Sequence, residues 1–335
     1  MKFAYTADIH LSKYGQDTIE QTSNLPERLH SIKETLYNIG NYCYDHDIRT
    51  LIIGGDLLHN KSIIYTIAQD MMLDFFEAYD DLEFWVIDGN HDLSGKGSEA
   101  ISSLRSLHNM LNVVWVSKSP VNYNNILMIP YSYNMIKPIK ESKADILISH
   151  FGLNEGILNS GISIVADIGL KDLIGKYKLV LLGHYHKPQE IINDNISLYY
   201  VGSPVQLDWG EKNEDKRFLV IDTETLEVES ISTTGYKKYL EYEITEENKQ
   251  EILEKARQEK ECGSYVKIVQ KTKVELGDVS DLNIIDKSEV DITNRGVSSS
   301  MSKADIFRRY VEAKEIPEKE IEYYLQAATQ LIEGI

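Results

Sequence analysis

The stretch Leu51–Asn60 reads LIIGGDLLHN, in which a short apolar run leads directly into two glycines, a carboxylate and a histidine. Phe84–Asp92, FWVIDGNHD, repeats this order with a longer run and places asparagine and histidine after the glycine. Runs of four or five residues rich in isoleucine, valine and aromatic residues predict buried strands. Both stretches therefore predict strands whose carboxyl ends carry polar side chains.

Apolar runs of the same kind recur along the chain. The others are Phe3–Thr6, Val113–Val116, Ile126–Ile129, Ile146–Ile148, Leu179–Leu182, Leu198–Val201 and Phe218–Ile221. Between the early runs, Leu29, Ile32 and Leu36 follow the spacing of an amphipathic helix, and Met71–Phe76 marks a second helix. Strands that alternate with helices and then give way to a strand-rich stretch predict a layered α/β domain over residues 1–234.

The sequence changes character after Gly235. A strand-like run at Tyr239–Ile244, a charged helical segment and an alternating run at Tyr265–Val274 predict a small α+β domain over residues 235–296. A serine-rich linker precedes the last segment, residues 302–335, which is predicted to form two amphipathic helices. Their apolar faces comprise Ile306, Phe307, Tyr310, Val311, Tyr324 and Leu325. These faces either pack on the α/β domain or dock into a groove of a partner protein.

Composition narrows the class of protein. With 335 residues, 42% of them hydrophobic, the chain is long enough for a catalytic domain and a smaller module. Its formal net charge of −18 argues against general affinity for nucleic acid, so DNA contact requires local basic residues, metal ions or a partner. The two distant cysteines, Cys43 and Cys262, exclude a disulfide framework and suit the cytoplasm. We expect no signal peptide, because MKFAYTADIH leads straight into a short strand-like run followed by acidic residues. We expect no membrane span, because no apolar run reaches about 18 residues.

Five polar clusters follow predicted strands. They are DIH at Asp8–His10, GD at Gly55–Asp56, GNHD at Gly89–Asp92, SH at Ser149–His150 and GHYH at Gly183–His186. The carboxyl ends of strands in an α/β sheet form the crevice where ligands bind, so we expect the five clusters to meet there. A single histidine after a strand is more often a structural residue, but five clusters in this order form a specific pattern.

Seven side chains in these clusters offer only oxygen or nitrogen donors. They are Asp8, His10, Asp56, Asn90, His150, His184 and His186. Seven donors are too many for one ion and suit two divalent cations about 3.5–4 Å apart that share a carboxylate. Imidazole and carboxylate without thiolate suit two Mn²⁺ ions, and Fe²⁺ or Zn²⁺ would also fit. Such a pair attracts phosphate and activates water for attack on phosphorus.

The motif series DIH, GGDLLH, GNHD, SH and GHYH resembles the calcineurin-like metallophosphoesterase superfamily. The details are more similar to its SbcD-type DNA repair nucleases, since GDLLH resembles their GDLFH and YYVGSPVQLDWGE resembles their GSP segment. HFGLNEGILNSGI resembles phage-encoded members. The motifs extend to about Asp222. The resemblance implies a sandwich of mixed β-sheets flanked by helices, a small α+β capping domain, and C-terminal helices that dock an SbcC-type coiled-coil ATPase.

The resemblance also implies a role for each donor. One metal would be held by Asp8, His10, Asp56 and His186, and the other by Asp56, Asn90, His150 and His184. His91 would stabilise or protonate the leaving oxygen, and Asp92 would orient the His91 ring, although a capping role in a turn is an equal alternative for Asp92. His59 would help to place the phosphodiester.

Four residues near the motifs are candidates for contact with the DNA backbone. They are Lys13, Tyr14, Lys61 and Lys187. Solvated loop residues are an equally good interpretation of each lysine. No residue is suited to reading base edges, so we expect sequence-independent cleavage. No arginine follows Asp56 within Leu58–Lys61, where phosphatases of the superfamily bind a phosphomonoester, and this favours a diester substrate.

The leading hypothesis is a Mn²⁺-dependent DNA exonuclease/endonuclease subunit of an SbcCD-like recombination and repair complex. The resemblance implies a homodimer, and the host cytoplasm as location if the chain is phage-encoded. One alternative is a small-molecule or cyclic-nucleotide phosphodiesterase, which needs neither the capping domain nor the docking helices. Another is a non-enzymatic metal-binding scaffold, which has no need of His91 beside Asn90.

Overall fold

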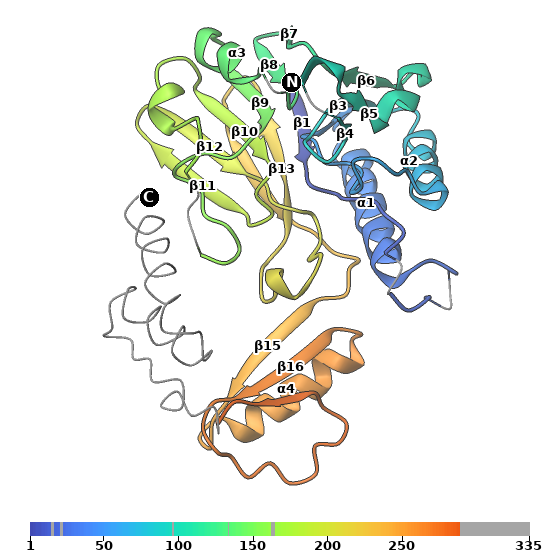
Figure 1. Ribbon diagram of the computed structural model, residues 1–335, viewed down its shortest axis with the longest axis vertical. Coiled ribbons are helices and arrows are strands. Elements are labelled where there is room, and N and C mark those ends of the chain that lie inside the picture. Colours follow the sequence, from blue (N-terminus) through green and yellow to red (C-terminus); the bar gives the residue numbers. More distant parts are fainter. Residues whose placement is uncertain (15–16, 21–22, 96, 133, 162–164, 289–335) are drawn as a thin grey trace, which may run out of the picture. The chain divides into compact units, whose positions relative to one another are not determined.

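The computed structural model describes residues 1–288 apart from 15–16, 21–22, 96, 133 and 162–164 (Figure 1). The chain forms two compact units. Of the described residues, the first comprises Met1–Leu240 and Lys260–Tyr265, and the second comprises Glu241–Glu259 and 266–288. The predicted helices of 302–335 lie outside the described residues. The division into 1–234, 235–296 and 302–335 therefore stays a prediction.

The first unit contains two six-stranded sheets. The first has the order β14-β13-β1-β2-β3-β6 and comprises β1 (Lys2–Thr6), β2 (Thr50–Ile53), β3 (Glu83–Ile87), β6 (Val113–Val116), β13 (Arg217–Asp222) and β14 (Val228–Ser232). The second has the order β11-β12-β10-β9-β8-β7 and comprises β7 (Val121–Tyr123), β8 (Ile126–Ile129), β9 (Ile146–His150), β10 (Leu179–Gly183), β11 (Gln189–Asn193) and β12 (Ile196–Tyr200). Both sheets are mixed, with four parallel strands each. Antiparallel pairing occurs at one edge of the first sheet, through β13 and β14, and at both edges of the second, through β11 and β7.

The two sheets pack face to face around a shared core. Tyr5 and Trp85 from the first sheet lie in one buried cluster with Met128, Ile148 and Leu181 from the second. The intervening residues of the same strands point to the outer faces, where helices cover them. This explains why the strands read as continuous apolar runs, since both faces of each sheet are buried. The predicted layered α/β sandwich is confirmed.

Helices cover the outer faces of both sheets (Figure 1). The helices α1 (Glu27–Asp45) and α2 (Thr66–Ala78) pack on the first sheet, and α3 (Ile136–Glu141) packs on the second. The buried stripe of α1 keeps the predicted 3–4 spacing. The helix itself begins directly after Pro26, whose fixed φ suits a helix start. Shorter elements connect the strands. They are β4 (Leu93–Ser94), β5 (Ile101–Ser102) and 3₁₀ turns at Gly97–Glu99, Ser103–Asn109, Leu170–Asp172 and Trp209–Glu211.

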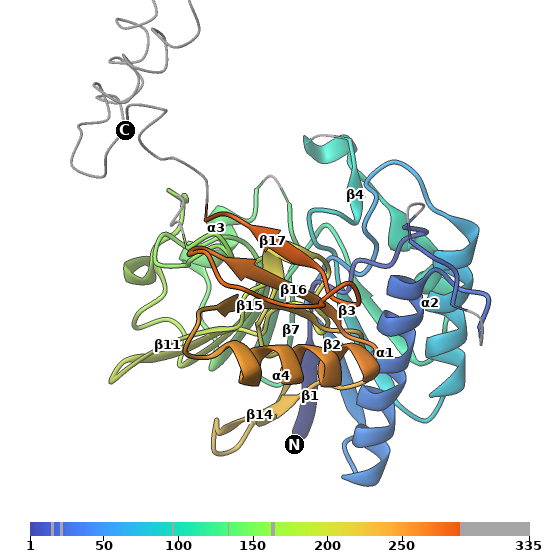
Figure 2. The ribbon, with the colours of Figure 1, turned by 90° about the horizontal axis from the view of Figure 1, so that it is seen from below.

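The second unit has an α+β arrangement. Three strands, β15 (Tyr239–Ile244), β16 (Tyr265–Gln270) and β17 (Ile284–Asp286), form a sheet in that order, and α4 (Lys249–Glu261) packs against it (Figure 2). Ile244, Ala256 and Ile268 form its small core. Within the described ranges, every helix is too short or too polar to cross a membrane.

Candidate active site

Polar side chains at the carboxyl ends of strands from both sheets meet at one edge of the sandwich. Asp8 follows β1, Asp56 follows β2 and Asn90 follows β3, while His150 ends β9 and His184 follows β10. The two sheets are joined directly here, because the His184 backbone N–H lies 3.0 Å from each carboxylate oxygen of Asp8. The structure therefore brings the five sequence clusters together.

The loop backbone is strained where it presents several of these side chains. Positive φ angles occur at Asp8 (55°), His10 (56°), Asp56 (52°) and His184 (95°). Residues other than glycine rarely adopt this region, and such conformations concentrate at functional sites. Gly55, with φ of 96°, approaches the site so closely that a Cβ would lie 2.5 Å from Nδ1 of His150.

One group of donors lies around His10. Its Nε2 atom is 3.0 Å from Nε2 of His186 and 3.7 Å from Oδ2 of Asp56. Donor atoms of Asp8, His10 and His186 all lie within 4.8 Å of one another. Asp8 and His10 are buried, whereas His186 is partly exposed, so this group is open to solvent on one side.

A second group surrounds the amide oxygen of Asn90. This oxygen is 3.1 Å from Nε2 of His150 and 2.9 Å from Nδ1 of His184. Nε2 of His150 is also 3.3 Å from Oδ2 of Asp56. The same carboxylate oxygen of Asp56 thus lies next to both groups.

The distances and chemistry of both groups fit divalent cations. Ligands bound at about 2.1 Å to one ion lie about 3.0–3.4 Å apart in adjacent positions, which matches the closest donor pairs. Two nitrogen atoms that face each other at 3.0 Å, as in His10 and His186, suit a shared ion. Oxygen and imidazole donors without thiolate suit divalent transition metals. The residues present therefore fit two ions that share Asp56.

The pKa shifts within the site follow its burial and charges. Burial lowers the pKa of His10 well below its usual value and that of His184 to about 4, which keeps a lone pair available on both rings. Burial also opposes charge on His150, but the adjacent Asp56 carboxylate outweighs it and raises the pKa of His150 to about 9. Burial would raise the pKa of Asp56, yet His150 and His10 hold it well below its usual range.

A carboxylate that sequence reasoning missed supports His186. Oε1 of Glu211 lies 2.8 Å from Nδ1 of His186, and its Oε2 atom lies 2.7 Å from Nζ of the fully buried Lys216. Burial acts to raise the pKa of Glu211, but His186 and Lys216 lower it to about 2. Glu211 therefore fixes the ring so that Nε2 faces His10. It stands at the end of the GSPVQLDWGE segment, the one sequence signal that pointed toward it.

His59 and His91 lie beside the first donor group. Nδ1 of His59 is 3.3 Å from Nδ1 of His10, and its carbonyl oxygen is 2.6 Å from Nδ1 of His91. The rings of His91 and His10 are 4.8 Å apart. Because a carbonyl only accepts, Nδ1 of His91 carries a proton and Nε2 is the atom that can gain or lose one.

Of the two interpretations of Asp92, the structure records contacts of the capping kind, while the His59 carbonyl contacts Nδ1 of the His91 ring. The buried carboxylate of Asp92 accepts hydrogen bonds from the backbone N–H groups of Leu58 and Gly89, both at 2.9 Å, and of Leu57 at 3.4 Å. Asp92 therefore joins the two loops that carry Asp56 and Asn90. The physical reason is that unpaired loop N–H groups this deep in the fold need an acceptor. Burial, followed by nearby carboxylates, raises the pKa of Asp92 to about 8.

The candidate DNA contacts have different surroundings. Lys13 and Lys61 are exposed and Lys187 is partly exposed, each in a loop next to a donor cluster. Tyr14 is used within the chain, since its hydroxyl donates to the His10 carbonyl and the Arg28 guanidinium lies 4.6 Å from its ring centre. Contact of these residues with DNA stays a prediction.

Comparison with known proteins identifies a family and several relatives. The family model for calcineurin-like phosphoesterases matches residues 1–188. Exonuclease subunit 1 of Enterobacteria phage T4 is 28% identical over 211 residues, which are 59% of this chain and 60% of that protein. Putative phosphoesterase 244L of Invertebrate iridescent virus 6 is 24% identical over 195 residues, 52% of this chain and 64% of the viral protein. The chain thus spans less than two thirds of either curated relative.

Two solved structures are also similar. An archaeal phosphodiesterase aligns with 69% of this chain and 99% of its own, at a TM-score of 0.36 and 13% identity. The nuclease MPE of Pseudomonas putida aligns with 68% of this chain and 87% of its own, at a TM-score of 0.33 and 16% identity.

Proposed function

Because the chain belongs to the calcineurin-like phosphoesterase family, we propose that it is a DNA exonuclease/endonuclease subunit that hydrolyses phosphodiesters with two divalent metal ions. The family assignment confirms the resemblance seen in the motifs and the prediction of a metal-dependent phosphoesterase. The observation that carries the proposal is the convergence of seven oxygen and nitrogen donors on two adjoining groups joined by Asp56. The similarity to a phage exonuclease subunit supports DNA as the substrate.

Each group of donors would hold one ion. The proposed ligands of the first are Asp8, His10, Asp56 and His186, and those of the second are Asp56, Asn90, His150 and His184. Two Mn²⁺ ions, or Fe²⁺ or Zn²⁺ in their place, would when bound supply positive charge for the phosphate and lower the pKa of a water molecule at the site. Glu211 and the Gly54 carbonyl, which lies 2.8 Å from Nδ1 of His150, fix the rings of two ligands.

His91 is proposed to act on the leaving oxygen. The His59 carbonyl holds its Nδ1–H, and the backbone N–H of His91 donates to Oδ1 of Asp56 at 2.7 Å. The ring is thereby fixed from two directions, with Nε2 left to hydrogen-bond or protonate the oxygen that departs. His59, whose side chain contacts His10, is proposed to position both this ring and the first donor group.

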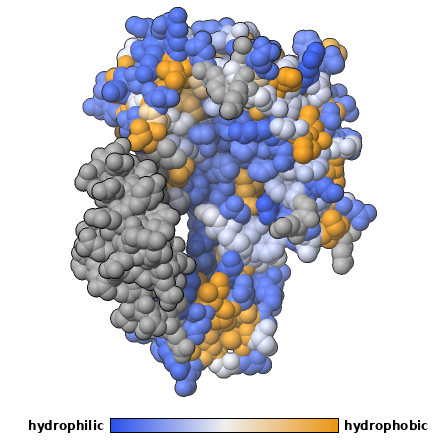
Figure 3. Space-filling view, viewed as in Figure 1, coloured by the Kyte–Doolittle hydropathy of each residue, from blue (hydrophilic) through white to orange (hydrophobic). Residues whose placement is uncertain are grey.

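The charge of the chain makes a partner part of the proposal. A net charge of −18 repels DNA at long range, and hydrophilic residues predominate on the face of the first unit shown in Figure 3. We infer that an SbcC-type coiled-coil ATPase supplies DNA affinity and that residues 302–335 dock on it. A homodimer, a cytoplasmic location and a role in recombination and repair belong to the same proposal.

A small-molecule or cyclic-nucleotide phosphodiesterase is the second candidate. The cavity of about 350 Å³ beside His184 has room for the base of a single nucleotide, and this observation favours it. Assays of metal-loaded protein with linear DNA, a cyclic nucleotide and bis-p-nitrophenyl phosphate distinguish the two functions. We expect DNA cleavage that EDTA stops and that Asp8→Asn abolishes. Hydrolysis of the small diesters without DNA cleavage, even with the ATPase partner present, would overturn the nuclease proposal.

A further inference from the structure

A pocket of about 350 Å³ opens directly beside the second donor group. His184 forms part of its wall, together with the aromatic residues Tyr131, Phe151 and Tyr185. Ile168 adds an apolar surface, and Val165 stands at the pocket with 87% of its surface exposed. We call this the His184 pocket. Its wall contains one proposed metal ligand, so a substrate held at the donors has the pocket within reach.

The pocket depends on a residue without a side chain. Gly152 lines it, and a Cβ at this position would lie 2.8 Å from the Tyr185 hydroxyl and 3.4 Å from Cδ2 of His184. Tyr185 is itself buried, with its ring centre 5.4 Å from that of His184. A larger residue at Gly152 would therefore push against the rings of Tyr185 and His184, which form the wall of the pocket.

The side chains of the pocket favour an uncharged occupant over a phosphate. Among its described lining residues none is lysine or arginine, and the carboxylate of Asp167 is present. A phosphate would meet repulsion there, whereas a flat uncharged group would meet aromatic and apolar surface. A nucleobase has this chemistry, and base stacking on aromatic side chains is tolerant of sequence.

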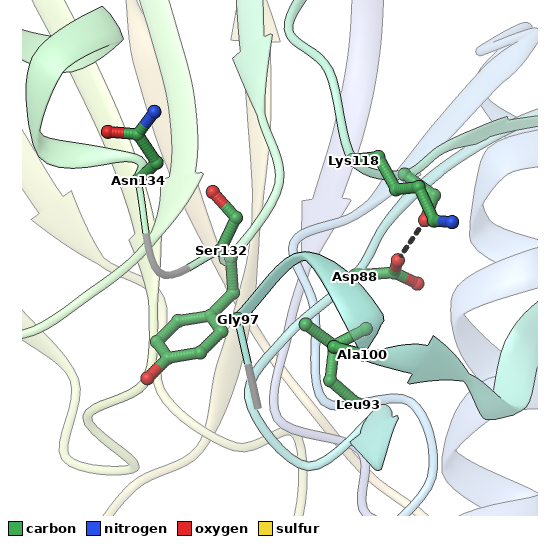
Figure 4. Close-up of a pocket in the computed structure, with 9 residues that line it drawn as sticks. Asp88, Leu93, Gly97, Ala100, Lys118, Ser132 and Asn134 are labelled. Carbon is green, nitrogen blue, oxygen red and sulfur yellow. Dashed lines mark hydrogen bonds between the residues drawn. The ribbon is translucent and has the colours of Figure 1, made fainter. Parts of the chain in front are cut away.

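A second pocket, of about 420 Å³, lies on the other side of Tyr131 and Ser132, which line both. In Figure 4, Ser132 and Asn134 face Asp88, Ala100 and Lys118 across it. Its described lining includes none of the seven proposed metal ligands. The Asp88 carboxylate accepts from the Ser102 hydroxyl at 2.7 Å and from the Trp115 indole at 3.0 Å, so it serves the fold. This pocket supplies a control position for the first.

We propose that the His184 pocket binds the nucleobase of the nucleotide whose phosphate lies at the donor groups. The inference rests on the proposed nuclease function and deepens it, because it makes the enzyme require a base next to the scissile phosphate. The phosphate, sugar and base of one nucleotide then span the donors and the pocket. Since the wall is apolar and aromatic, purines and pyrimidines are both accepted.

Ligands with and without a base test the pocket. Deoxynucleoside 5′-monophosphates and deoxyribose 5-phosphate are titrated into metal-loaded protein by calorimetry and compared as inhibitors of bis-p-nitrophenyl phosphate hydrolysis. We expect the nucleotides to bind about 10-fold more tightly, the range that stacking of one base supplies. DNA whose terminal nucleotide is abasic should be cut correspondingly more slowly.

Three substitutions at exposed positions locate the effect. Val165→Asp places a charge at the pocket and should remove the preference for nucleotides over deoxyribose 5-phosphate. Leu111→Asp, at a fully exposed position outside the pocket, should retain it. Asn134→Ala, which changes only the second pocket, should also retain it.

The outcomes separate the pocket from the nuclease proposal. Cleavage of DNA with equal binding of nucleotides and deoxyribose 5-phosphate overturns the pocket and leaves the nuclease standing. The base pocket is also overturned if Asn134→Ala removes the preference for nucleotides while Val165→Asp leaves that preference intact. Tight nucleotide binding that Val165→Asp abolishes, without DNA cleavage, supports the base pocket and turns the substrate into a smaller phosphodiester.

Discussion

Nδ1 of His186 lies 2.8 Å from Oε1 of Glu211, although 25 residues separate them in the sequence. The other carboxylate oxygen of Glu211 contacts the buried ammonium of Lys216 and, at 2.9 Å, the hydroxyl of Ser203. A metal-binding histidine commonly donates its second N–H to such a carboxylate, which fixes the tautomer and the ring orientation. Glu211 thus connects the proposed metal site to the interior of the fold.

Replacement of Glu211 should weaken metal binding. Glu211→Gln keeps the side-chain shape but removes the charge that orients His186, so metal affinity at the first donor group should fall about 10–100-fold. Glu211→Ala also removes a carboxylate that neutralises the buried Lys216 ammonium, and a broken buried ion pair can cost about 3–5 kcal/mol of folding stability. Calorimetric titration with Mn²⁺ and thermal unfolding measure the two effects.

Glu214→Gln is the matched control for this prediction. Glu214 also contacts Nζ of Lys216, at 2.9 Å. The contact to His186 is made by Glu211, so Glu214→Gln leaves that contact in place. This variant should lose some stability while it retains metal affinity. Equal metal affinity in Glu211→Gln and Glu214→Gln would contradict the positioning role of Glu211.

Asp92→Ala should destabilise the fold and not merely slow the reaction. Three backbone N–H groups would lose their acceptor, and one unsatisfied buried group costs about 1–3 kcal/mol. The loops that carry Asp56 and Asn90 would then be free to separate, so metal affinity should fall as well. Chemical denaturation and Mn²⁺ titration test this. A variant of normal stability with reduced rate alone would instead favour the ring-orienting role expected from the sequence.

Glu27 and Lys237 should make stability depend on acid pH. Burial acts to raise the pKa of Glu27, but Lys237, 2.8 Å away, and other hydrogen bonds lower it to about 2. A lowered carboxylate pKa stabilises the fold above the unfolded value of about 4.3, and the gain is lost as pH falls toward 2. Lys237→Gln should therefore destabilise clearly at pH 7 and less at pH 3, where part of the gain is already lost.

An exposed ion pair provides the comparison for the pH prediction. Lys178 lies 2.6 Å from Asp145, but its side chain is 67% exposed. Such surface pairs contribute little, so Lys178→Gln should change stability only slightly at either pH. A Lys237→Gln effect that is equally large at pH 3 and pH 7 would show that the Glu27 carboxylate is not its source.

The sequence predicted the strands well because both sheet faces are covered. The run Phe84–Ile87 lies within β3, and Ile126–Ile129 coincides with β8. Continuous burial leaves a strong apolar signal, and parallel strands necessarily present their carboxyl ends at one edge. For the same reason the seven donors could be selected before their distances were known.

The supporting contacts of the site could not be predicted in the same way. Glu211 reaches His186 from a short 3₁₀ turn, where no periodicity marks a functional residue. Asp92 stands beside His91 in the sequence, which suggested a pair, but its carboxylate oxygens accept from backbone N–H groups, which every residue except proline possesses. Contacts to the main chain depend on loop geometry and leave no residue pattern to read.

His91→Ala and His59→Ala should affect different steps. The His91 ring is proposed to act on the leaving oxygen, so its loss should reduce kcat about 10²–10⁴-fold while Mn²⁺ affinity stays within a factor of about two. His59→Ala keeps the carbonyl that holds His91 but removes the ring that contacts His10, so metal affinity should fall as well as rate. Single-turnover cleavage of linear DNA together with Mn²⁺ titration separates the two variants. If His91→Ala cleaves at the wild-type rate, or if it loses metal as His59→Ala does, the proton-donor role is wrong and the ring serves only to build the site.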